Sequence, residues 1–120
     1  MAKNKNRDFH EYIMGDVFSG MSGVTSRAMF GGYGIYKDGK IFAIIVEEKL
    51  YFKAGNSNKA EYERAGSEPF RYTVPNGKVF EMAYWELPAD ILEDRDELPR
   101  WMEKSLAVNA EKKETKGKKK

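Results

Sequence analysis

The sequence predicts an α+β domain in which helices form a second layer on a mainly antiparallel sheet. Apolar residues in the middle of the chain recur with the period of two that is typical of strands. Asp38-Gly39 and Asn76-Gly77 are preferred hairpin turns, which join antiparallel neighbours. Three other segments follow the helical period and open with capping residues. The expected order is helix, three strands, helix, two strands, helix, an arrangement typical of helices packed on an antiparallel sheet.

The first helix is expected from Asp8 to about Ser19. Asp8 and Glu11 have the spacing of a capping box, and apolar residues then follow the helical period. Gly20 can end the helix. His10 is the only histidine of the chain, and we expect it to be a solvated helix residue.

The first three strands are expected at Ala28–Lys37, Lys40–Glu47 and Leu50–Lys53. The second of them is apolar on both faces, which is typical of a central strand that is covered on both sides or at least half covered. A second helix of about two turns follows and is expected to end at Gly66 with a left-handed backbone.

Two further strands are expected on either side of Asn76-Gly77, the second at Lys78–Trp85. This dipeptide predicts a two-residue turn with positive φ at both positions. The last helix is expected to open with a capping box at Asp94 and to have an irregular first turn around Pro99.

Charge divides the 120 residues into three parts. Residues 111–120 hold six lysines and two glutamates, and residues 1–8 hold three basic groups and one acidic group. Residues 9–110 therefore carry a net charge of −4, although the whole chain carries +2. We expect a basic arm at 1–8, a folded domain at 9–110 and a disordered lysine-rich tail at 111–120. An acidic domain argues against a nucleic-acid-binding surface on the domain itself.

Composition also excludes several kinds of bond and site. The chain has no cysteine, which excludes disulfides and thiolate metal sites, and no apolar run long enough to span a membrane. We therefore expect a cytoplasmic protein. Four serines are candidate nucleophiles, but no motif links His10 to Ser19, Ser22, Ser26 or Ser57. The carboxylates show no catalytic spacing either. We expect no enzymatic activity, no cofactor and no metal.

A glycine-rich stretch within residues 27–36 allows two interpretations. In the first, the glycines are structural and bend the first strand, so that Met29 and Phe30 reach the core beside the first helix. In the second, the backbone amides of Gly31–Gly34 form an anion site together with Arg27. A phosphate loop of the usual kind needs a helix N-terminus after the glycines, and the sequence predicts a strand there.

The glycine-rich stretch, together with the motifs that follow it, resembles the N-terminal domain of the TfoX/Sxy family. The resemblance runs from about Phe9 to Asn109, and other motifs follow the glycine-rich stretch in the right order: Leu50-Tyr51-x-Lys53, Gly66-x-x-Pro69-Phe70, Tyr84-x-x-x-Pro88 and Leu98-x-x-Trp101. The residues that carry the family signature, of unknown role, are Arg27, Met29, Phe30, Gly31, Gly32 and Gly34.

The resemblance implies a fold similar to that of type III secretion chaperones. It also implies a relation to regulators of natural competence, which act with a cyclic-AMP receptor protein at promoters. Those regulators carry a second, C-terminal domain, and we expect this chain to be a single-domain member. The resemblance brings no catalytic residues with it.

We therefore expect a non-enzymatic protein-binding module that acts as an accessory protein of transcription or competence. The partner would be another protein, held at a sheet edge or an exposed aromatic patch. One alternative is a nucleic-acid accessory factor whose Lys112–Lys120 tail makes weak contacts. The other is an anion-binding domain at Gly31–Gly34. A monomer and a homodimer are both compatible with the sequence.

Overall fold

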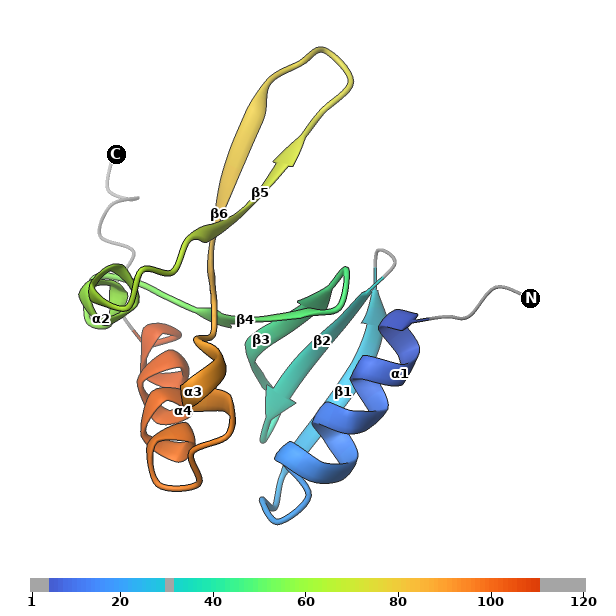
Figure 1. The fold of residues 1–120 in the computed structure, drawn as a ribbon, viewed down its shortest axis with the longest axis vertical. Coiled ribbons are helices and arrows are strands. Elements are labelled where there is room, and N and C mark those ends of the chain that lie inside the picture. Colours follow the sequence, from blue (N-terminus) through green and yellow to red (C-terminus); the bar gives the residue numbers. More distant parts are fainter. Residues whose placement is uncertain (1–4, 30–31, 111–120) are drawn as a thin grey trace.

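The computed structural model describes residues 5–29 and 32–110 of the chain. Its strands form one antiparallel sheet in the order β1-β2-β3-β4-β6-β5, with helices packed against it (Figure 1). This confirms the predicted α+β class; the likeness to type III secretion chaperones stays a prediction. In chain order the elements are α1 (Lys5–Tyr12), the π-helix η1 (Ile13–Val17), β1 (Val24–Met29), β2 (Gly32–Lys37), β3 (Lys40–Val46), β4 (Lys49–Lys53), α2 (Lys59–Arg64), β5 (Pro69–Thr73), β6 (Val79–Glu86), α3 (Ala89–Leu92) and α4 (Glu97–Val108).

The expected first strand is in fact two antiparallel strands. Met29 at the end of β1 is the partner of Gly32 at the start of β2, so the chain reverses between them. Phe30 and Gly31 lie outside the described residues. The expectation that the glycines only bend one strand was therefore wrong. Glycine clusters also permit reversals, and periodicity alone does not separate the two cases.

The first helix begins at Lys5, before the predicted start, so Asp8 lies inside it rather than at its cap. The stretch expected as a basic arm thus contains the first helical residues. The helix then widens into η1, where the amide of Phe18 donates to the carbonyl of Ile13 at 2.9 Å. This i→i+5 bond is the pattern of a π-helix. The helical segment therefore ends with η1 at Val17, before Ser19.

The core lies between the sheet and the helices. Phe42 of β3 is fully buried and makes edge-to-face contacts with Phe18 and Phe52, at centroid distances of 5.6 and 5.4 Å. Tyr62 of α2 makes a similar contact with Trp101 of α4 at 4.8 Å. Each such side chain contributes roughly 1.5–3 kcal/mol by its burial. The predicted central position of β3 is confirmed, because it is paired with β2 on one side and β4 on the other.

The turns follow the predicted chemistry in part. Asp38 and Gly39 have φ values of 52° and 86°, which confirms a two-residue turn of the preferred type. At the β5–β6 turn only Gly77 has a positive φ, of 93°. The amide of Val74 donates to the carbonyl of Lys78 at 2.9 Å, so the loop has three residues. The expected two-residue turn was wrong. Pro75 starts a three-residue turn instead, and only its last residue, Gly77, has a left-handed backbone.

The predicted helix ends are confirmed in two places. Gly66 has a φ of 80° and follows Ala65, the C-cap of α2. The Asp94 carboxylate accepts hydrogen bonds from the amides of Asp96 and Glu97, at 2.9 and 3.0 Å, just before α4 and at its first residue. The capping box is only half formed, because the Glu97 carboxylate accepts from Arg100 and Trp101 instead. Pro99 is therefore the third helical residue, inside the first turn, where a missing N–H costs no helical bond. The short helix α3 was not expected.

Candidate functional site

Within the part of the chain that the structure describes, the helices cover only one face of the sheet. Tyr33 of β2 stacks on His10 of α1 at 3.8 Å, so odd-numbered residues of β2 face the helices. Phe52 of β4 and its partner Trp85 face the same way. The residues next to them, among them Gly34, Tyr51 and Tyr84, therefore face away from α1, α2 and α4. We call this helix-free side the open face.

The open face is hollowed and mostly apolar. The hollow has a volume of about 600 Å³ and extends from β1 to the β5–β6 hairpin. Its lining includes Met29, Ile41, Ile44, Phe70, Tyr72, Met82 and Tyr84. Apolar hollows with a few polar groups are the usual form of binding sites, and contiguous exposed apolar patches mark interaction surfaces.

The hairpin of β5 and β6 forms an arm that extends away from α3 and α4 (Figure 1). Strand β4 pairs with β6 only at Tyr84, Trp85 and Glu86, so the outer part of β6 has β5 as its one strand partner among the described residues. Three large side chains on the open face of this arm are exposed: Tyr72 by 44%, Phe80 by 45% and Met82 by 38%.

A row of aromatic rings joins the arm to the hollow. Tyr51 lies edge-to-face against Phe70 at 5.2 Å, Phe70 stacks on Tyr72 at 6.3 Å, and Tyr72 contacts Phe80 at 5.7 Å. Tyr51 is buried and Phe80 is exposed, so the row leads from the body to the solvent. The alternation of β5 and β6 puts these rings on one face.

The reverse face of the arm is polar. Arg71 forms ion pairs with Glu81 at 3.0 Å and with Glu68 at 3.4 Å. These groups are exposed, and such pairs contribute little to stability. Val79 is an exception on this face, with an exposed fraction of 58%. The arm therefore has one apolar face and one charged face.

Tyr51 and Tyr84 are two of the polar groups on the open face. Burial raises the pKa of Tyr51, and the nearby carboxylates of Glu86 and Glu47 raise this pKa further. Burial also raises the pKa of Tyr84, with a smaller contribution from Tyr36. Both hydroxyls therefore keep their protons well above neutral pH and can donate hydrogen bonds to a bound chain.

The structure places the described signature residues on this face. Met29 lies opposite Gly32, and its Sδ and Cε atoms would lie 3.2 and 3.1 Å from a Cβ added at Gly34. Met29 therefore packs on the open face, and the expectation that it reaches the core beside the first helix was wrong. Arg27 is exposed on β1, opposite Gly34. Phe30 and Gly31 lie outside the described residues.

Gly32 and Gly34 of β2 allow neighbouring atoms to approach the main chain of this strand closely. A Cβ at Gly32 would overlap the main-chain carbonyl oxygen of Ile45, and one at Gly34 would press on Met29 and Ile41. Gly34 lies in a strand paired on both sides, with Arg27 of β1 and with Ile44 of β3. Its neighbours' amides are therefore used in the sheet ladders, which disfavours an anion site at the described part of Gly31–Gly34.

The histidine is not a solvated helix residue. His10 Nε2 lies 2.7 Å from Ser26 Oγ, and its ring stacks on Tyr33. Desolvation lowers the pKa of His10, although the charge of Glu11 opposes this effect. The sequence offered no link between His10 and Ser26 because α1 and β1 meet only in the fold. Among the described contacts of His10 there is no carboxylate hydrogen bond that would orient the ring as in a hydrolase.

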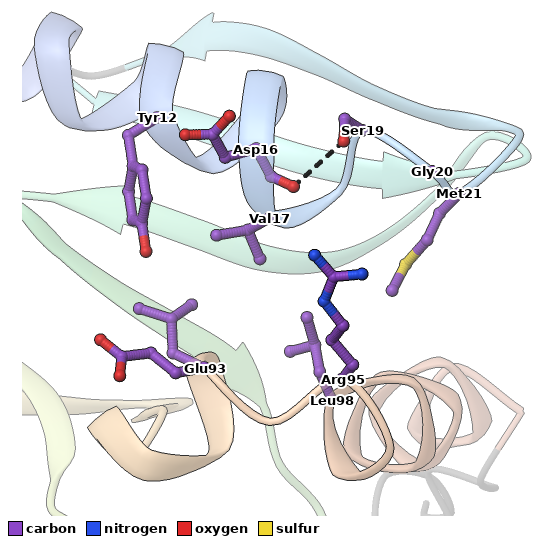
Figure 2. Close-up of a pocket in the computed structure, with 10 residues that line it drawn as sticks. Tyr12, Asp16, Val17, Ser19, Gly20, Met21, Glu93, Arg95 and Leu98 are labelled. Carbon is purple, nitrogen blue, oxygen red and sulfur yellow. Dashed lines mark hydrogen bonds between the residues drawn. The ribbon is translucent and has the colours of Figure 1, made fainter.

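A second hollow of about 440 Å³ lies between η1 and the α3–α4 connection (Figure 2). Arg95 extends into it from the α4 side, and Tyr12 borders it from α1. The Ser19 hydroxyl donates to the Asp16 carbonyl at 3.1 Å, which is a local helix-end bond rather than a catalytic one. This hollow lacks the continuous apolar lining of the open face.

Within residues 5–29 and 32–110, no group of three or more histidine, cysteine or acidic side chains is placed to hold a metal ion. No helix in the described part of the chain is both long and apolar enough to cross a membrane.

Comparison with known proteins identifies the family of most of the chain. A family model described as the TfoX N-terminal domain matches residues 16–109. The chain belongs to the TfoX N-terminal domain family. The DNA transformation protein TfoX1 of Aliivibrio fischeri (strain ATCC 700601 / ES114) is 27% identical over 74 residues. That match covers 57% of this chain and 35% of the relative, so the chain spans only about a third of that relative's length.

Within this family domain, the alternation along β6 predicts that Phe80, Met82 and Tyr84 share one side of the strand. It does not predict that this side is exposed, because large apolar side chains at such positions are usually core. The exposure of Tyr72 and Phe80 follows from the length of the arm beyond β4. A signal was present in the charged residues of β5 and β6, which make a fully buried ribbon improbable.

Proposed function

We propose that this chain is a non-enzymatic protein-binding module of the cytoplasm, with an accessory role in transcription or competence regulation. The observation that carries the proposal is the open face, with its apolar hollow and its row of aromatic rings. A partner protein would cover this face and bury the exposed rings of the arm.

The chemistry of the face favours a protein partner. Tyrosine, phenylalanine and methionine are enriched at protein interfaces, and these residues dominate here. A nucleic-acid surface needs clustered basic groups, whereas residues 9–110 carry a net charge of −4. The family supports the regulatory part of the proposal, since a relative is named as a DNA transformation protein.

Site-specific photo-crosslinking in the native cytoplasm tests the proposal. A photoreactive residue at Tyr72, on the open face, is expected to capture a defined protein partner. The same residue at Val79, on the reverse face of the arm, is the matched control and is expected to capture that partner much less. Phe80→Glu should reduce capture from position 72 at least tenfold, because it places a charge on the apolar face. Equal capture from both positions would contradict the proposal.

The lysine-rich segment favours a second candidate, a nucleic-acid contact made by Lys112–Lys120. This segment lies outside the described residues. Titration with duplex DNA at low and moderate salt separates the candidates. If the segment alone makes the contact, its deletion abolishes a binding that already weakens steeply with salt. Binding that survives the deletion would place the nucleic-acid surface on the domain.

A further inference from the structure

We propose that a second copy of this chain covers the open face, so that the domain works as a two-fold symmetric dimer. This inference rests on the proposed function, because it names the partner of the same face. The supporting juxtaposition is that exposed rings and an apolar hollow lie side by side on one surface.

A two-fold interface uses the same patch on both subunits, so the patch must contain both a projection and a matching hollow. The arm provides the projection, since Tyr72 and Phe80 are each more than 40% exposed at its apolar face. The hollow beside it reaches Met29 and Ile41 on the body. When two copies face each other, the arm of each lies over the hollow of the other.

Charge supports the same arrangement. The arm ends in a turn followed by the exposed Lys78. Away from the tip of the arm, Glu47 in the β3–β4 turn and Glu86 at the base of β6 lie close enough to Tyr51 to act on its hydroxyl. A lysine at the tip of one arm would thus meet the acidic border of the other copy. A partner without a basic tip would lack this match.

The stability of the arm also favours a partner that packs on its apolar face. From the pair Arg71–Glu81 to the pair Thr73–Val79, its two strands pair only with each other among the described residues. A two-stranded ribbon is marginally stable in water and gains stability from a packed face. A second open face provides that packing by burying the aromatic row, as two sheets do when they stack face to face.

Sedimentation velocity on the full chain tests the dimer. The wild-type protein is expected to sediment as a dimer at micromolar concentration. Phe80→Glu should weaken association at least tenfold, whereas Val79→Glu, on the opposite face of the same strand, should leave it unchanged. Both positions are exposed, and circular dichroism checks that each variant keeps its fold. A monomeric wild type, or equal loss in both variants, would overturn the inference.

Crosslinking tests the placement of the arm without relying on a charged substitution. The chain has no cysteine, so each introduced thiol is unique. Lys78→Cys protein mixed with Glu47→Cys protein should give mixed dimers with a short bismaleimide, in a yield well above that of either protein alone. If only like proteins crosslink, the arrangement is wrong. If the wild type is monomeric while position 72 still captures another protein, the dimer fails and the proposed function stands; if neither is found, both fail.

Discussion

The main chain of β3 passes so close to β2 that a Cβ atom at Gly32 would overlap the carbonyl oxygen of Ile45. Gly32 does not have a positive φ, so it is the contact and not the backbone conformation that requires glycine. The signature glycines thus serve the sheet that carries the open face.

Gly32→Ala is expected to destabilise the domain by about 1–3 kcal/mol, because the strands must separate to admit a methyl group. Gly15→Ala is the control, since a Cβ there meets nothing within 4 Å and the residue is helical. That change should be neutral or stabilising. Urea denaturation measures both, and an unchanged midpoint for Gly32→Ala would show that β2 and β3 can separate at little cost.

We expect that a substitution in the β3–β4 turn can stabilise the domain. Glu47 and Glu48 have φ values of 52° and 64°, a left-handed conformation that residues with a Cβ adopt at a cost. Replacing the pair by Asn-Gly should stabilise the domain by about 1 kcal/mol. Asp38→Asn in the neighbouring turn is the control and should change little, since Gly39 already follows. Thermal denaturation compares the two, and a loss of stability with Asn-Gly would mean that the glutamates make a compensating contact.

Stability is expected to rise with pH around the titration of His10. The pKa of His10 is lowered below 6.5 in the fold, so the unfolded chain binds the proton more readily. The contribution is therefore fully present above pH 6.5 and is lost as the pH falls through the lower folded value. Chemical denaturation from pH 7.5 downward measures the slope. His10→Gln keeps a hydrogen-bonding group toward Ser26 but does not titrate, so this part of the slope should vanish; an identical slope would assign it to other groups.

Inorganic phosphate and nucleotides are expected not to raise the melting temperature of the protein. The described amides of the Gly31–Gly34 stretch belong to a strand paired on both sides, which leaves few donors for an anion. A shift in differential scanning fluorimetry that disappears in Arg27→Ala would restore the anion-site interpretation. A shift of equal size in both proteins would indicate unspecific binding.

Much of the fold could be predicted from the sequence because it depends on interactions between residues close together in the chain. The continuous apolar run within Lys40–Val46 predicted a central strand, and Asp38-Gly39 predicted the turn before it. The Asp94 carboxylate was recognised as a cap. Such features are set by steric preferences and hydrogen bonds within a few residues. The order of motifs around the glycines also identified the family.

What the tertiary structure decided is which faces are covered. The sequence could not show that Met29 packs away from α1, that His10 meets Ser26, or that the chain reverses between Met29 and Gly32. Alternation shows which residues share a face, but coverage depends on how far neighbouring elements extend. Because β4 stops beside the base of β6 and the helices all lie on the other side, Tyr72 and Phe80 stay exposed rather than becoming core.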